Sequence, residues 1–167
     1  RETYFHIVRL WSDAGFTIKN LVDGSVTEIG REGVLKVCPE LSAIELPSGL
    51  LMRYDDLQCN PVKVENERPE YTYKTRKGRT RIYGGKLIEN VCQAIARCII
   101  AEQMLKISKR YKVVLTVHDS VACCVPTEQG VEARAYMEKC MRWLPTWADG
   151  LPIDCESGTG LSYGDCE

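Results

Sequence analysis

Apolar residues at helical spacing predict a helix at the start of the chain. The segment RETYFHIVRLWSDAGF, residues 1–16, places apolar side chains three or four positions apart, at Tyr4, Phe5, Val8 and Trp11 or Leu10. Glycine is a weak helix former, so we expect Gly15 to end this helix.

A second and longer helix is predicted between Leu87 and Ile107. Apolar residues recur there every three or four positions, at Ile88, Val91, Cys92, Ile95 and Ile99. The other side of this helix carries a stripe of hydrogen-bonding side chains, formed by Lys86, Asn90, Gln93 and Arg97. A solvated face would explain the stripe, but amides and cations also suit contacts with phosphates and base edges.

Three segments have the composition of β-hairpins. LSAIELPSGLLMRYDD reads as two short strands around the turn residues 47–49, and YTYKTRKGRTRIY reads as two strands around Lys77-Gly78. KVVLTV and VACCVP are rich in β-branched residues and flank His118-Asp119-Ser120 at a tight turn. A further helix is expected after Thr127, and GLPIDCE reads as a last strand. The order of elements predicts an α+β fold in which antiparallel strands and a β-hairpin pack against long amphipathic helices.

Composition indicates one ordinary domain core. The chain has 167 residues, 44% of them hydrophobic, and a net charge of -1. It has neither an apolar run of membrane-spanning length nor the pattern of a signal peptide, so we expect a cytoplasmic protein with no membrane partner. Nine cysteines without a C-x-x-C pair predict reduced and mostly buried thiols. The chain begins at Arg1, which suggests a fragment of a larger protein.

One stretch is strongly basic despite the balanced total charge. KTRKGRTRIYGGK contains no acidic residue and six cations, at Lys74, Arg76, Lys77, Arg79, Arg81 and Lys86. Such a strip is the expected footprint of a nucleic-acid phosphate backbone.

The His118-Asp119 dipeptide is the main candidate for chemistry. An aspartate at the tip of a hairpin is held on a rigid support, which suits the presentation of a carboxylate to a metal. Magnesium takes hard oxygen ligands and usually keeps only one or two protein carboxylates, so one aspartate is half a site. Alternatively, Asp119 simply makes a local turn bond.

The segment VVLTVHDSVACCVP resembles the third sequence motif of the family A DNA polymerases, in which a strand-turn-strand hairpin carries His-Asp-Glu or a variant. RIYGGKLIENVCQAIARCIIAEQM is similar to the long palm helix that precedes this hairpin in bacteriophage members. WLPTWADGLPIDCE, IELPSG and RETYFHIVRLW also resemble segments of that group, in the same order. The likeness covers nearly the whole chain.

This resemblance implies a palm-type sheet and a division of the chain. Residues 1–30 would be the end of the fingers region with a connecting helix, and residues 31–167 the palm subdomain. The palm would contain a basic hairpin over 70–83, a long helix over 85–109, a metal-binding hairpin over 112–125, and a C-terminal helix and strand over 127–167.

The resemblance also implies site residues and partners. Asp119 would be a catalytic metal ligand and His118 would lie near the primer terminus, in an enzyme that uses two Mg²⁺ ions to extend a primer on a template with deoxynucleoside triphosphates. The family implies contacts with primer-template DNA for Lys86, Asn90, Gln93, Arg97, Arg76, Lys77, Arg79 and Arg81. Ser120 departs from the pattern, because many members have Glu there.

The second carboxylate motif and the nucleotide-binding fingers helix of the family have no counterpart in this chain. The leading hypothesis is therefore a C-terminal polymerase fragment, inactive alone, that works with the fingers, thumb and remaining palm of the same polypeptide in a host cytoplasm. A non-catalytic nucleic-acid-binding module on a palm-like scaffold is the alternative. A cysteine hydrolase and an HD-type phosphohydrolase are disfavoured, because His6 and His118 are the only histidines. A fragment would also expose apolar surface, so self-association is plausible.

Asp55 and Asp56 in RYDDL are a rival pair of candidate metal ligands. They resemble the Tyr-x-Asp-Asp hairpin of reverse transcriptases but lack the residue between Tyr and Asp. An ordinary exposed strand end is the simpler interpretation of this pair.

Overall fold

The computed structural model describes residues 4–25, 28–29, 34–60 and 69–166. The chain mixes helices with antiparallel strands, in agreement with the predicted α+β class. It divides into two compact units, Arg1–Ile95 and Ala96–Glu167. Within the described part, the strands form three separate sheets. The expected boundary between residues 30 and 31 lies outside the described residues, and the division into two units falls within a helix instead.

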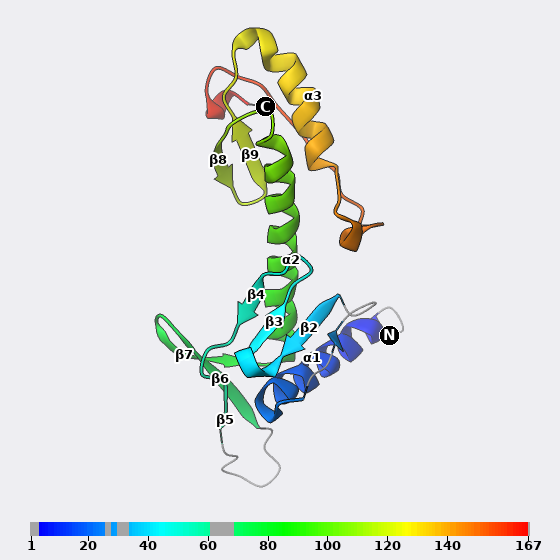
Figure 1. Ribbon diagram of the computed structural model, residues 1–167, viewed down its shortest axis with the longest axis vertical. Coiled ribbons are helices and arrows are strands. Elements are labelled where there is room, and N and C mark those ends of the chain that lie inside the picture. Colours follow the sequence, from blue (N-terminus) through cyan, green and yellow to red (C-terminus); the bar gives the residue numbers. More distant parts are fainter. Residues whose placement is uncertain (1–3, 26–27, 30–33, 61–68, 167) are drawn as a thin grey trace. The chain divides into compact units, whose positions relative to one another are not determined.

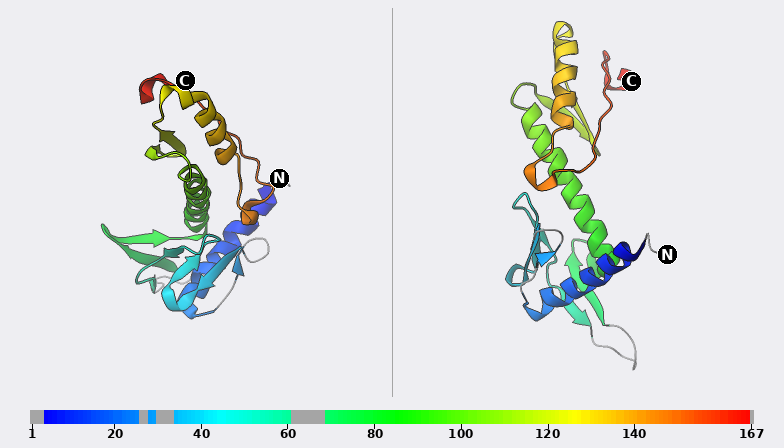
Figure 2. Two further views of the ribbon diagram at one scale, coloured as in Figure 1. Left: turned by 45° about the horizontal axis from the view of Figure 1, so that its top comes forward. Right: turned by 90° about the vertical axis from the view of Figure 1, so that its right-hand side faces the viewer.

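The first unit contains one long helix and two antiparallel sheets (Figure 1). Helix α1 (Phe5–Asp23) lies along the four-stranded sheet and contacts β1 and β2 (Figure 2). That sheet has the order β1-β2-β3-β4, formed by Glu28–Ile29, Leu35–Cys38, Ala43–Glu45 and Leu51–Arg53. The second sheet has the order β5-β6-β7, formed by Gln58–Asn60, Glu70–Thr75 and Gly78–Ile82.

Helix α1 differs from its prediction in both its end and its buried face. It continues through Gly15 and ends at Gly24, which has a left-handed φ of 82° and donates its N–H to the Asn20 carbonyl. A glycine inside a helix costs about 1 kcal/mol, and packing on both sides of Gly15 offsets it. The buried side chains are those of Ala14, Thr17, Ile18 and Leu21. Phe5 and Val8, which follow the predicted spacing, are exposed.

The hairpins of the first unit confirm the turn predictions. β3 and β4 pair across Pro47-Ser48-Gly49, where Gly49 has the positive φ of 81° that favours glycine. β6 and β7 fall within the predicted basic hairpin over 70–83, with Thr75 opposite Gly78 at the turn. Both turns were readable because their chemistry is local.

Helix α2 (Gly84–Ile107) is the predicted long helix and contributes residues to both units. Its start is fixed by close packing within the first unit, since a Cβ on Gly84 would lie 2.2 Å from the carbonyl oxygen of Trp11. Of the predicted apolar positions, Val91 and Ile99 are buried, Ile88 and Ile95 are half-buried, and Cys92 is exposed. Leu87 lies outside the predicted set and is fully buried. The glycine of the YGGK segment therefore permits a backbone contact that any side chain would block.

The second unit packs a β-hairpin and a helix on the last turns of α2. Strands β8 (Val113–Val117) and β9 (Ser120–Cys123) form a two-stranded sheet on one side, and α3 (Gly130–Met141) lies on the other (Figure 1). The core joins the three elements through Ile107, Tyr111, Ala133 and Cys140, with Val113, Val121, Cys123, Val125, Tyr136, Met137 and Met141 packed against it.

A buried amide ties α2 to the end of α3. Gln103 is 1% exposed, and its Nε2 donates to the carbonyl oxygens of Met141 at 2.6 Å and Trp143 at 3.0 Å. Because both carbonyls follow the last turns of α3, the amide satisfies acceptors that a helix end leaves open.

Two further expectations are wrong. The segment GLPIDCE is not a strand, because its polar groups bond to α3 rather than to a sheet: Arg142 binds the Asp154 carboxylate at 2.7 Å and the Cys155 carbonyl at 3.0 Å. The thiols are not mostly buried either, since only Cys98 and Cys140 are buried.

Among the described residues, no helix is long and apolar enough to cross a membrane.

We predict that Gln103→Met lowers the free energy of unfolding by about 2 kcal/mol, because it leaves two carbonyl groups without their donor at similar side-chain volume. Chemical denaturation monitored by circular dichroism measures the change. Gln93→Met is the matched control, because Gln93 lies on the same helix with an exposed side chain. Equal stability of the two variants would contradict the role of the buried amide.

Acid should weaken the attachment of the C-terminal segment to α3. The hydroxyl of Ser157, together with Arg142 and Arg134, lowers the pKa of Glu138 from 4.5 to about 2. A carboxylate with a depressed folded-state pKa stabilises the fold above its unfolded pKa, and this contribution is lost as pH falls from 4.5 through 2.

Glu138→Gln removes this titration. We therefore expect the stability difference between wild type and Glu138→Gln to be largest above pH 5 and to shrink toward pH 2, measured by denaturant unfolding at each pH. A difference that is constant with pH would contradict the assignment.

Candidate functional site

The His118-Asp119 dipeptide forms the turn of the β8–β9 hairpin, as predicted. Val117 pairs with Ser120 across the two-residue turn, and His118 has a φ of 54°, in the left-handed region that non-glycine residues rarely adopt. That conformation costs about 1 kcal/mol or more for a residue with a Cβ. Both His118 and Asp119 are exposed. The hairpin thus holds an imidazole and a carboxylate out into solvent.

Arg97 joins this turn from α2. Its Nη1 lies 3.5 Å from the carbonyl oxygen of His118, so a member of the predicted helix stripe lies beside the predicted metal ligand. Both residues belong to the second unit. Arg97 therefore contacts the backbone of the turn that carries His118 and Asp119, which places an arginine on the same hairpin end as the exposed imidazole and carboxylate.

A magnesium ion would find few ligands at this turn among the described residues. Asp119 offers one exposed carboxylate, which is the kind of ligand magnesium prefers. Among the described residues, no three or more His, Cys, Asp or Glu side chains gather closely enough to hold a metal ion. Ser120 provides no carboxylate at the next position. The donors in the described part of the chain are therefore too few for a pair of ions, which needs at least one further carboxylate.

The other members of the helix stripe bond within the first unit. Lys86 Nζ lies 2.9 Å from the carboxylate of Glu89, which raises the pKa of Lys86, and Gln93 Nε2 lies 3.4 Å from the same group. Asn90 Nδ2 donates to the buried hydroxyl of Tyr54 at 3.2 Å. Glu89 is therefore an acidic residue that pairs with the positive charge of the stripe. A ligand would have to compete with it for Lys86 and Gln93.

Burial dominates the environment of the Tyr54 hydroxyl. Desolvation raises the pKa of Tyr54 to about 12, while the hydrogen bond from Asn90 acts in the opposite direction. Tyr54 is 2% exposed and is among the largest fully buried side chains. Asn90 therefore has a clear structural role at this point of the stripe.

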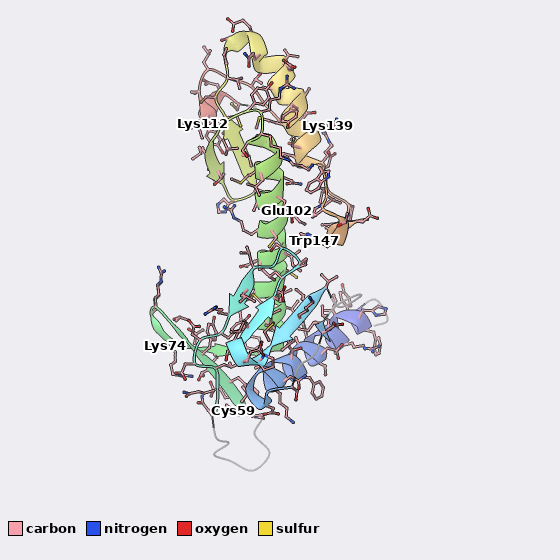
Figure 3. All side chains as sticks on the ribbon, in the orientation of Figure 1. Cys59, Lys74, Glu102, Lys112, Lys139 and Trp147 are labelled. Carbon is pink, nitrogen blue, oxygen red and sulfur yellow. The ribbon has the colours of Figure 1, made fainter. Side chains whose placement is uncertain are left out.

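The cations of the basic hairpin fall into two groups. Arg79 Nη1 binds the Asp56 carboxylate at 2.6 Å and Arg81 binds Glu70 at 2.5 Å, so both arginines are held in ion pairs. Lys74, Arg76 and Lys77 are exposed, and the described residues offer them no ion pair. The free positive charge therefore gathers at the tip of the β6–β7 hairpin, where Figure 3 labels Lys74.

The Asp55-Asp56 pair takes part in a structural contact. Asp56 accepts hydrogen bonds from Arg79 and from Gln58 Nε2 at 2.7 Å, and these bonds lower its pKa. A carboxylate engaged by arginine is poorly placed to bind a metal ion. The interpretation of these residues as an ordinary strand end is supported.

A second group of cations was missed by the sequence analysis. The segment LKISKRYKV contains no acidic residue, and Lys106 and Lys109 in it line a pocket together with Lys139 of α3. The absence of acids was a readable signal. The sequence could not show that Lys139 of α3 joins them, because Lys139 lies thirty residues beyond Lys109 in the chain.

Comparison with known proteins relates the chain to a viral polymerase. Over 122 residues it is 33% identical to a DNA polymerase of Bacillus phage SP02, in an alignment that covers 68% of the chain and 18% of that polymerase. The chain is therefore similar to a part of a phage DNA polymerase and spans less than a fifth of its length. No protein-family model matches the chain, and no solved structure does.

If this chain binds DNA, we predict that the binding depends on the tip of the basic hairpin. Replacing Lys74, Arg76 and Lys77 together by Gln should weaken DNA binding and reduce the slope of log affinity against log salt by about 2 to 3, because each lost phosphate contact releases one counterion fewer. Fluorescence anisotropy of a labelled duplex between 50 and 200 mM salt, the range over which such contacts are strongly screened, measures both effects.

The matched control changes the same amount of charge elsewhere in the first unit. Lys19, Lys36 and Arg53 are exposed, and their joint replacement by Gln should leave the slope nearly unchanged. An equal loss in both triple variants would show that total charge, rather than the hairpin tip, governs binding.

Proposed function

We propose that this chain is the C-terminal palm portion of a family A DNA polymerase and takes part in template-directed extension of a primer. The observation that carries the proposal is the His118-Asp119 turn: an exposed carboxylate on a supported hairpin with Arg97 beside it. The identity with a phage DNA polymerase over 68% of the chain supports the same function.

In this proposal Asp119 contributes one carboxylate to a site for two Mg²⁺ ions. Bound magnesium would neutralise charge on the reacting phosphates. The second carboxylate comes from another segment of the same polypeptide, because the described residues contain no further cluster of ligands. His118 lies next to this carboxylate with its ring in solvent, where it can donate a hydrogen bond to a phosphate oxygen of the primer end.

DNA would be held by the unpaired cations. Lys74, Arg76 and Lys77 contact backbone phosphates without reading sequence, and Arg97 does the same near the hairpin turn. Arg79 and Arg81 hold the basic hairpin in place through Asp56 and Glu70. Gln93 contacts the duplex once its weak bond to Glu89 is exchanged, and Lys86 follows if DNA displaces it from the same acid.

The exposed apolar surface suits the remaining palm, fingers and thumb. Val114, Leu115 and Val117 of β8 are between 39% and 49% exposed, on a sheet of two strands. Two-stranded sheets are marginal in water, so further strands of a palm sheet would pair with the edges of this sheet, and the rest of the polypeptide would cover its exposed apolar side chains. Without them, the chain would self-associate through the same surface.

A non-catalytic nucleic-acid-binding module remains the second candidate. Ser120 in place of an acidic residue favours it, because the hairpin then carries one carboxylate rather than two. The unpaired cations at the hairpin tip would serve this function without any metal ion.

Primer extension by the longer polypeptide that contains this chain tests the choice. Asp119→Ala should reduce extension at least a thousandfold and leave duplex affinity within about twofold, because loss of transition-state stabilisation does not require loss of ground-state binding. Asp119→Asn is the isosteric control for folding and should lose activity to a similar extent. Thr116→Ala, on the same strand, should retain it.

The outcome separates the two candidates. Extension that survives in Asp119→Ala would remove this carboxylate from the mechanism. A wild-type polypeptide that binds the duplex in a salt-dependent manner but never extends a primer would favour the binding module.

A further inference from the structure

A small basic pocket lies in the second unit, between the end of α2 and α3. Its volume is about 170 Å³, and it is lined by Lys106, Lys109, Tyr136, Lys139, Cys140 and Trp143. Sites for organic ligands are typically about 300 Å³ or larger, so this pocket suits a small group rather than a whole nucleotide. It shares no residue with the His118-Asp119 turn, and the inference below does not rest on the proposed function.

The three lysines of the pocket have no acidic partner among the described residues. The acids on the neighbouring elements are engaged elsewhere: Glu132 with Arg110, Glu138 with Arg134 and Arg142, and Glu102 with the indole N–H of Trp147 at 3.2 Å. Figure 3 shows Glu102 and Trp147 next to one another. The ammonium groups of Lys106, Lys109 and Lys139 therefore leave positive charge that the protein does not neutralise.

Backbone carbonyls do not neutralise the lysines either. The ends of two helices meet at this pocket, and helix ends present carbonyl oxygens that attract cations. Here the Lys106 carbonyl accepts the Tyr136 hydroxyl at 3.0 Å, and those of Met141 and Trp143 accept the Gln103 amide. Among the described residues, none of the three ammonium groups bonds to these carbonyls, so the ammonium groups remain available to an added anion.

The Trp143 ring positions one of the three lysines. Lys106 Nζ lies 4.0 Å from the centre of the Trp143 ring, a cation–π contact that holds the half-buried ammonium group at the pocket. Lys109 and Lys139 are exposed at its rim. Three lysines, from the end of α2, the segment after it and α3, thus line a space of limited size.

We propose that this pocket binds a phosphate group, held by Lys106, Lys109 and Lys139. Three ammonium groups offer up to nine N–H donors and no acceptor, which matches the acceptor-only oxygens of a phosphate or diphosphate. The group can come from free pyrophosphate or from the backbone of a nucleic acid. Both sources present the same chemistry to the pocket.

Calorimetric titration of the 167-residue chain with sodium pyrophosphate tests the site. We expect saturable binding at one site per chain that Lys139→Gln and Lys109→Gln each weaken roughly tenfold, the size expected for one charge-assisted hydrogen bond. Lys112→Gln is the matched control. It removes an exposed lysine of the same unit that does not line the pocket, and Figure 3 places Lys112 and Lys139 on opposite sides of this unit.

A second measurement on the unaltered protein is independent of variant folding. Pyrophosphate should slow the reaction of Lys106, Lys109 and Lys139 with an amine-reactive label at least threefold, and should leave Lys112 unprotected, as read by peptide mass spectrometry. Competition then identifies the source of the phosphate. An oligonucleotide that displaces pyrophosphate shows that backbone phosphates occupy the pocket, and one that does not shows that a free phosphate compound does.

Absence of saturable pyrophosphate binding would overturn the proposal. So would binding that Lys112→Gln weakens as much as Lys139→Gln, or equal protection of all four lysines. Loss of pyrophosphate binding in the lysine variants together with intact primer extension would separate this pocket from the function of Asp119.

Discussion

The β8–β9 hairpin depends on the core beneath it, because a two-stranded sheet is at best marginally stable in water. Its inner side chains pack on Ile107 and Tyr111 from the end of α2, and on Ala133 and Cys140 from α3. The Gln103 amide in turn holds the end of α3 to α2. The position of the exposed carboxylate of Asp119 thus follows from apolar burial and one buried amide, neither of which contacts the turn itself.

Ion pairing decides which of the many cations are available to a ligand. Arg79 and Arg81 lie in the most basic stretch of the sequence, yet both are bound to carboxylates within the first unit. Lys74, Arg76 and Lys77 on the same hairpin remain unpaired among the described residues. Within one stretch of high cation density, some cations therefore fasten the hairpin through ion pairs and others keep their charge exposed to solvent.

The similarity to a phage DNA polymerase and the exposed carboxylate of the His118-Asp119 turn agree with one another, but each is incomplete. The chain corresponds to 18% of that polymerase, and its described residues provide one carboxylate at the hairpin. Two-metal chemistry needs further ligands, and phosphoryl transfer needs the reacting groups held in line. The described residues thus combine a single exposed carboxylate at the turn with exposed apolar side chains on the neighbouring strand.

Much of the local structure could be predicted from the sequence. The α2 helix, the hairpin turns at Gly49 and Gly78, and the placement of His118-Asp119 between two strands all follow from apolar period and turn chemistry, which are properties of neighbouring residues. The sequence alone also singled out Asp119 and Arg97 as candidate site residues. The sequence could not show that Arg97, in the predicted helix stripe, reaches the carbonyl oxygen of His118, in the predicted turn.

Tertiary structure decided the features that depend on residues far apart in the chain. Gly15 stays helical because the following turns of α1 are buried, and GLPIDCE is not a strand because Arg142 binds its polar groups. The pairing of Arg79 with Asp56 and the convergence of Lys106 with Lys139 are likewise products of packing. A sequence pattern reports the preferences of adjacent residues, whereas burial and charge pairing are set by whichever distant groups the fold brings within contact.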